Sequence, residues 1–209
     1  MQHLQFLSAG GGDWVIYLLL LFSVLAVAVI IERVMVVTRE AQYQESVLAA
    51  ATAKIEEGPR EVLKALKPDS ILYRLSQELI SHADNGVVAL ERHLETRLAL
   101  ERRNLEQRTV ILGTLGNNAP FVGLLGTVLG VIKAFHDLGA AAGLGPEVVM
   151  EGISQALVAT AVGILVALPC VAAFNFIKKR IKDLLIDADR FGHQLIAVLE
   201  SGKSVKAAR

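Results

Sequence analysis

The chain has 209 residues, of which 53% are hydrophobic and 20% charged, and its 21 basic and 21 acidic side chains give a net charge of zero. Charges are nearly absent from long apolar tracts and dense between them, which excludes a disordered chain and an evenly mixed soluble domain. Because no basic excess is present to neutralise phosphates, we expect no nucleic-acid partner. The single cysteine, Cys170, excludes an intrachain disulfide and a cysteine-based zinc site.

The first apolar tract, residues 14–31, contains no charge over 18 residues. As a helix it rises about 27 Å, close to the thickness of the hydrocarbon core of a membrane. We therefore predict a transmembrane helix over residues 14–37, preceded by an outer segment, residues 1–13. A cleaved signal peptide is the alternative, but residues 1–13 contain no lysine or arginine and the apolar run exceeds the usual signal length.

The next segment, residues 38–108, is charged and predicts helices separated by turns. Breaks are expected at Gly58-Pro59, at Pro68-Asp69-Ser70, where Asp69 or Ser70 is suited to cap the next helix, and at Asp84-Asn85-Gly86. From Val87 to Arg108 the apolar residues recur at helical spacing. No breaker follows, so we expect this helix to continue into the next apolar tract. Its charges predict a solvated or subunit-facing surface, with a binding role as the alternative.

Two further tracts, residues 109–135 and 153–177, are each long enough to cross a membrane. Eleven lysines and arginines lie in residues 38–108 and none in the loop 136–152, so the positive-inside rule predicts that the N-terminus is outside and the C-terminus inside. The tail, residues 178–209, predicts an amphipathic helix that rejoins the cytoplasmic helices. The expected fold is therefore all-α: a polytopic membrane protein with three transmembrane helices and a cytoplasmic helical bundle. A single span would leave both later tracts in water.

Small and weakly polar residues form one stripe on each of the two later spans. Lipid gives helices no hydrophobic drive to associate, so small residues that allow close backbone approach are typical of helix contacts. Two interpretations stay open: the stripes line a narrow pore or receive a partner helix, or they are ordinary packing surfaces whose threonines bond their own backbone. The stripes are Pro120, Gly123, Thr127, Gly130 and Ala134 on the second span, which also carries Gly126, and Ala156, Thr160, Gly163 and Ala167 on the third.

Other residue patterns give little support for chemistry. Pro120 inside a span is expected to kink it, with Asn117 or Asn118 covering the carbonyl that proline leaves unbonded. We find no histidine and carboxylate pattern that predicts a metal site, so we expect no metal. No nucleophile with a base and no phosphate-binding loop is visible, so we expect neither an enzyme nor a cofactor.

Two long motifs resemble a known family. LGTLGNNAPFVGLLGTVLGVIKAF (112–135) and GISQALVATAVGILVALPCVAAFNF (152–176) are similar to the core of the ExbB/TolQ proteins, which are relatives of the flagellar stator subunit MotA. Three spans and a short outer loop favour ExbB/TolQ over MotA, which has four spans. The resemblance covers both later spans closely, and the three-span plan extends it over most of the chain.

The resemblance implies a motor subunit of the bacterial inner membrane. Five copies are expected to form a ring around the membrane helices of an ExbD/TolR-like single-span partner, whose aspartate carries the proton. Proton flow then drives mechanical work, passed on to a TonB/TolA-like protein or to gliding machinery in the envelope. By motif, Thr127 and Thr160 are the pore-facing threonines.

This sequence departs from the family motif at one position. The glutamate of the family's GIxEALxATA falls on Gln155, whose amide cannot titrate. Glu151 stands one helical turn earlier on the same face, so we hypothesise that it replaces the missing carboxylate. The alternative is an exposed acid stabilised by the helix dipole.

Two other functions compete with the motor subunit. A non-conducting oligomeric scaffold or sensor would use the same stripes for assembly; Gln155 favours it and the two threonines oppose it. A solute transporter has less support because no inverted repeat or central charged site is visible.

Overall fold

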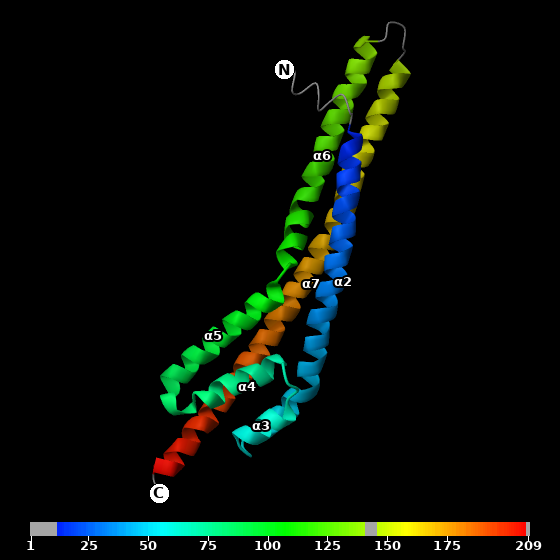
Figure 1. Cartoon of the computed structure of the whole chain (residues 1–209). Coiled ribbons are helices and arrows are strands. Elements are labelled where there is room, and N and C mark those ends of the chain that lie inside the picture. Colours follow the sequence, from blue (N-terminus) through cyan, green and yellow to red (C-terminus); the bar gives the residue numbers. More distant parts are fainter. Residues whose placement is uncertain (1–11, 141–145, 208–209) are drawn as a thin grey trace. The chain divides into compact units, whose positions relative to one another are not determined.

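The computed structural model describes residues 12–140 and 146–207, and within these ranges the chain is helical and contains no strand (Figure 1). Three helices are long and apolar enough to cross a membrane, as the sequence predicts: α2, α6 and α7. The helices in chain order are α2 (Asp13–Ala53), α3 (Pro59–Ala65), α4 (Ile71–Ser81), the short 3-10 helix η1 (Ala83–Asn85), α5 (Val87–Glu106), α6 (Thr109–Ala140) and α7 (Pro146–Ala207).

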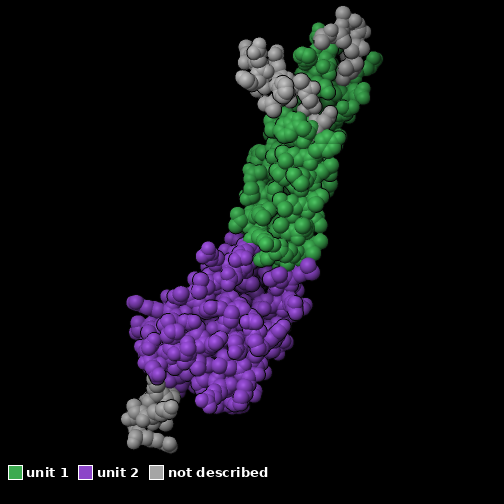
Figure 2. Space-filling view, viewed as in Figure 1, with its two compact units in different colours: residues 1–33, 108–175 green, residues 34–107, 176–209 purple. Residues whose placement is uncertain are grey.

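The chain divides into two compact units (Figure 2). Unit 1 comprises residues 1–33 and 108–175, and unit 2 comprises residues 34–107 and 176–209. Helices α2 and α7 each contribute residues to both units, α6 belongs to unit 1, and α3, α4 and α5 belong to unit 2. The apolar part of each candidate span therefore falls in unit 1.

Unit 1 presents large apolar side chains on its outer surface. Tyr17, Phe121 and Leu165 are 72%, 69% and 70% exposed, whereas the small residues Ala119 and Ala159 are buried. A soluble domain rarely exposes a contiguous apolar surface of this kind, because contact with water is costly. The pattern is that of helices whose outer faces meet hydrocarbon and whose small residues meet each other.

The helix that the sequence predicts to run from Val87 into the second span is interrupted, so this prediction is wrong. Helix α5 ends at Glu106 and α6 begins at Thr109. Between them Arg108 has φ 62°, a left-handed conformation that non-glycine residues rarely adopt. Its guanidinium Nη1 donates to Glu32 Oε1 and Oε2 at 2.7 and 2.8 Å. No glycine or proline marks the break in the sequence. The break is instead accompanied by an ion pair between residues 76 positions apart in the chain, which a local sequence pattern cannot reveal.

The turns of unit 2 follow the predicted signals. Helix α3 begins at Pro59 after Gly58, whose φ of 124° suits glycine. Ser70 caps α4, since its Oγ accepts a hydrogen bond from the Tyr73 backbone N–H at 3.3 Å. Gly86, with φ 85°, separates η1 from α5. The capping residue that the sequence left open between Asp69 and Ser70 is thus the serine.

The C-terminal part of α7 packs against α4 and α5, as its amphipathic pattern predicts. A Cβ atom added at Gly192 would lie 2.5 Å from Leu94 Cδ1 and 3.4 Å from Leu75 Cδ2, so the α7 backbone directly touches side chains of both helices. Phe191 and Leu195 flank this contact and are buried. The apolar faces of three helices thus form the core of unit 2.

A buried ion cluster also joins α4 to α5 within unit 2. The Glu101 side chain is 1% exposed, and Arg74 binds it through two hydrogen bonds, Nε to Oε1 at 2.8 Å and Nη2 to Oε2 at 2.6 Å. Arg97 Nη2 lies 2.7 Å from Glu101 Oε1. The hydrogen bonds to Glu101 raise the pKa of the Arg74 guanidinium above its ordinary value. A buried carboxylate is tolerable only with such partners.

Glu101→Gln should destabilise unit 2, because two arginines then face an uncharged amide. Breaking a buried ion pair by removing one partner lowers the free energy of unfolding by about 3–5 kcal/mol. Because the arginines are partly exposed, we expect a loss at the lower end, about 3 kcal/mol. That is a fall of about 6–12 °C in the melting temperature at this chain length. Circular dichroism of the full chain in detergent measures it. Glu91→Gln, an exposed acid of α5, is the control and should change little; equal melting temperatures for the two variants would contradict the expectation.

Candidate functional site

Helices α6 and α7 touch backbone to backbone along their small residues within unit 1 (Figure 1). A Cβ atom added at Gly163 would lie 2.6 Å from the Ala119 carbonyl oxygen, and one at Gly123 would lie 2.6 Å from the Ala159 carbonyl oxygen. Real Cβ atoms do not approach other atoms this closely. The glycines are therefore required by the close approach of the two helices.

Small residues from both stripes form this contact. Ala156, Gly163 and Ala167 are buried within the single chain. A Cβ added at Gly130 would lie 2.6 Å from Ala156 Cβ, which extends the contact along the helices. Gly126 faces two neighbours, because an added Cβ would lie 2.7 Å from Ala159 Cβ on α7 and 3.1 Å from Val15 Cγ1 on α2.

Pro120 leaves α6 uninterrupted, since the helix continues through it. The carbonyl that lacks an amide partner because of this proline is that of Gly116, four residues earlier. The Asn118 Nδ2 donates instead to the Thr114 carbonyl oxygen at 2.8 Å. Of the two residues predicted to cover the freed carbonyl, Asn117 and Asn118, the structure thus contradicts Asn118. The side chain supports a neighbouring turn of the helix.

The two motif threonines are in different environments. Thr127 is half-exposed, and its Oγ1 donates to the Leu124 carbonyl oxygen three residues back at 2.6 Å. The Thr160 Oγ1 is buried and has no hydrogen-bond partner among the described residues. A buried hydroxyl without a partner costs free energy, because it has lost its bonds to water. Packing alone gives no reason for a hydroxyl at Thr160.

A small hollow in unit 1 carries the polar side chains of the spans. Its walls come from α2, α6 and α7 and are largely glycine and alanine. Four polar or charged side chains line it: Lys133 and Asp137 from α6, and Glu151 and Gln155 from α7. The Gln155 Nε2 donates to Glu151 Oε1 at 3.3 Å, so the two α7 residues are directly bonded.

This arrangement fits the spacing predicted for Glu151 and Gln155 and adds two residues that the sequence analysis missed. Lys133 and Asp137 stand four residues apart on α6, as Glu151 and Gln155 do on α7, so each pair shares one helix face. This four-residue spacing is the sequence pattern from which Lys133 and Asp137 could have been predicted to share a site. Glu151 offers a titratable carboxylate where Gln155 cannot. The hollow thus combines proton-accepting groups with a lysine at one end of the packed helices.

Comparison with known proteins identifies the family. The model of the MotA/TolQ/ExbB proton channel family matches residues 64–189, which is more than half of the chain and includes all of α6. The chain belongs to this family. An ExbB-like biopolymer transport protein of Helicobacter pylori is 39% identical over 97 residues, covering 44% of this chain and 65% of that protein.

Other ExbB proteins show the same degree of similarity. ExbB of Xanthomonas campestris is 36% identical over 117 residues, covering 56% of this chain and 46% of that protein. ExbB of Aquifex aeolicus is 36% identical over 109 residues, covering 48% of this chain and 74% of that protein. The chain thus spans less than two thirds of the length of the Helicobacter and Xanthomonas relatives. Family membership and the three apolar helices make it a multi-pass membrane protein of a proton channel family.

Gly163→Ala should separate α6 from α7, because the added methyl group would meet the Ala119 carbonyl oxygen at 2.6 Å. Overpacking a close contact typically costs about 1–3 kcal/mol. We expect a lower melting temperature of the full chain in detergent. Gly139→Ala on α6 is the matched control, since nothing lies within 4 Å of its added Cβ. A Gly163→Ala variant as stable as Gly139→Ala would show that the helices do not meet at this glycine.

Proposed function

We propose that this chain is a subunit of a proton-driven motor in the bacterial inner membrane. Five copies form a ring around the membrane helices of an ExbD/TolR-like single-span partner that carries an aspartate in its span. Proton flow through the ring drives movement that serves the envelope, by way of a TonB/TolA-like or gliding-machinery protein. The observation that carries the proposal is the family match over residues 64–189, which covers both motifs, 112–135 and 152–176.

The distribution of basic residues supports the orientation. Eleven lysines and arginines lie between residues 38 and 108, in the part of the chain that forms most of unit 2. Cytoplasmic segments carry such an excess, so unit 2 lies in the cytoplasm and the N-terminus outside. Residues 136–152, which contain no lysine or arginine, then lie on the outer side.

Thr127 and Thr160 line the proton path in this proposal. The unpartnered Oγ1 of Thr160 supports the assignment, because a costly polar group in a membrane helix calls for a functional reason. In the ring, the half-exposed Thr127 hydroxyl donates to and accepts from the partner's carboxylate as it changes protonation state. One proton crossing about 100 mV releases about 2.3 kcal/mol, enough to bias a small movement of one component.

Glu151 supplies the carboxylate that Gln155 lacks. Glu147 lies in the first turn of α7, where the helix dipole acts, and Glu151 lies one turn further in. The dipole interpretation therefore suits Glu147 better than Glu151. The hydrogen bond from Gln155 to Glu151 holds this carboxylate beside the motif position, in the hollow lined by Lys133.

Thr160→Val should abolish proton flux without lowering the stability of the chain. The valine keeps the shape of threonine and removes a buried hydroxyl that has no partner, so the melting temperature should stay equal or rise. Proton flux in vesicles that contain this chain and its single-span partner should be lost. Normal flux in a folded Thr160→Val ring would remove this residue from the path.

Glu151→Gln should lower proton flux by at least about tenfold, equivalent to about 1.4 kcal/mol in the barrier. Glu147→Gln, one turn earlier on the same helix, is the matched control and should conduct normally. In the Glu151→Gln background, Gln155→Glu should restore flux, because it returns a carboxylate to the motif position. Full flux in Glu151→Gln alone would show that Glu151 does not replace the missing acid.

Proton flux in the presence of the partner distinguishes the motor subunit from the scaffold. The chain and its co-purified single-span partner are reconstituted in vesicles, and proton uptake is followed under an applied potential. A motor subunit gives flux that depends on the partner's aspartate. An oligomer that conducts no protons with its partner present would instead support the scaffold or sensor, and a monomer in lipid would contradict both.

A further inference from the structure

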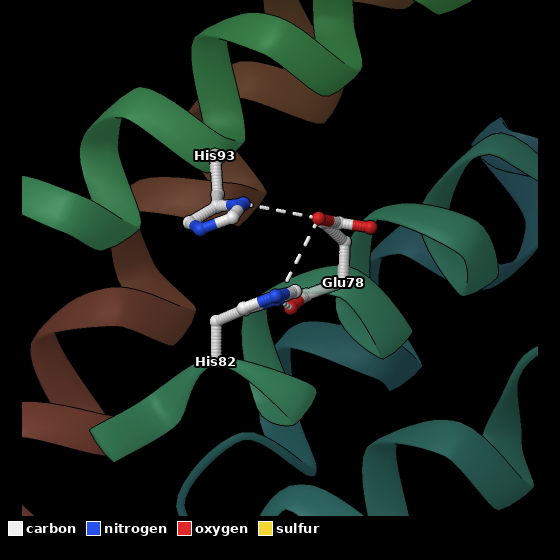
Figure 3. Close-up of side chains that lie close together, drawn as sticks. All are labelled: Glu78, His82 and His93. Carbon is white, nitrogen blue, oxygen red and sulfur yellow. Dashed lines mark hydrogen bonds and ion pairs between the residues drawn. The ribbon is translucent and has the colours of Figure 1, made fainter. Parts of the chain in front are cut away.

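A group of three ionisable side chains lies close together in unit 2, as the close-up in Figure 3 shows. Glu78 belongs to α4, His82 is the C-cap residue that directly follows α4, and His93 belongs to α5. Glu78 Oε1 lies 3.0 Å from His93 Nδ1 and 3.5 Å from His82 Nδ1. All three residues are half-exposed, so an ion in solution can reach them. We call them the Glu-His-His cluster.

This cluster contradicts the expectation, drawn from the sequence, that no histidine and carboxylate pattern points to a metal site. His82 follows Glu78 by four residues, the spacing that places both on one helix face, and this signal was missed. His93 stands 15 residues from Glu78 and reaches it only because α5 folds back along α4 after the turn at Gly86. Periodicity within one helix cannot reveal a contact of that kind.

The hydrogen bonds around His82 show which atoms hold protons. Ser81 Oγ donates to the Glu78 carbonyl oxygen at 2.9 Å, so toward His82 it can only accept. His82 Nδ1 lies 3.0 Å from that Oγ and 2.9 Å from the same carbonyl oxygen. Since these neighbours are acceptors, His82 Nδ1 carries a proton. By the same argument His93 Nδ1 carries one toward the Glu78 carboxylate.

These two protons occupy positions that a metal ion can take. We propose that the Glu-His-His cluster binds one divalent transition-metal ion of the Zn²⁺ class. Two imidazole nitrogens and one carboxylate oxygen are ligands that Zn²⁺ accepts, with a water molecule in the fourth position. On binding, the ion replaces the proton on each Nδ1, and Nε2 becomes the protonated nitrogen of each ring.

The distances within the cluster are close to those of a tetrahedral site. Bonds of about 2.0–2.1 Å at tetrahedral angles place ligand atoms about 3.3 Å apart. The three ligand atoms lie within 4.8 Å of one another, and both distances to Glu78 Oε1 bracket this value. One adjustment is needed. The His82 and His93 rings are stacked, with centroids 3.9 Å apart and planes at 21°, and a ring must tilt because each nitrogen lone pair lies in its ring plane.

A bound ion would link α4 to α5. The residues between His82 and α5 are η1 and Gly86, so the ion would close the turn between the two helices. Because the folded arrangement brings the ligands together, binding stabilises unit 2 by mass action. The site is independent of the proposed proton path, since none of its residues lies in unit 1.

The test uses the full chain, purified in detergent without a polyhistidine tag and freed of metal by chelation. Zn²⁺ is added by calorimetric titration, and Co²⁺ is added while its visible absorption is followed. We expect one ion per chain and a higher melting temperature with Zn²⁺. Glu78→Gln, His82→Gln and His93→Gln should each weaken Zn²⁺ binding by more than about 100-fold, since loss of a residue behind a ligand already costs 10–100-fold.

His193→Gln is the matched control. His193 lies 3.6 Å from Asp189 at the same four-residue spacing on α7, without forming a three-ligand group among the described residues. The His193→Gln variant should bind Zn²⁺ with the same affinity as the unchanged chain. Circular dichroism confirms that each variant is folded. Absence of stoichiometric binding by the unchanged chain, or unchanged affinity in the folded His82→Gln and His93→Gln variants, would overturn the proposal.

Discussion

The close contact of α6 with α7 is the constraint on which unit 1 depends. In lipid, apolar side chains gain nothing by turning away from their surroundings, so helices associate through close packing and hydrogen bonds. Gly123 and Gly163 provide that packing, because their hydrogen atoms face backbone atoms of the opposite helix. Larger residues at these positions would hold the helices apart. The placement of Thr160 and of the polar hollow follows from this contact.

The Glu101 carboxylate and the Thr160 hydroxyl are both buried, but only the carboxylate has partners within the described residues. In unit 2 the Glu101 carboxylate is almost fully buried and is matched by two arginines, which is the arrangement of a stabilising cluster. In unit 1 the Thr160 hydroxyl is buried and unmatched within the described residues. A polar group whose partners are complete within the chain needs no further explanation. One that lacks them costs free energy, because it has given up its hydrogen bonds to water.

The sequence predicts local features well and contacts between distant segments poorly. The apolar runs give three spans, Ser70 and Gly86 mark turns, and the spacing of Glu151 and Gln155 anticipates their hydrogen bond. The break at Arg108 was missed because its conformation accompanies a contact with Glu32, and the approach of His93 to Glu78 depends on a chain reversal. Such contacts arise from tertiary packing, which residue propensity and periodicity do not contain.

The division of residues between the inner and outer faces of α6 and α7 has a consequence for recognition. Gly123 and Gly163 are buried within the subunit, whereas the bulky Phe121, Leu165 and Leu168 are exposed on its surface. A neighbouring protein or lipid therefore meets the bulky side chains, which can be exchanged for one another with little effect on the interior. The outward side chains of the two motifs are therefore the surface that a neighbour can recognise, while their small residues hold the subunit's own helices together.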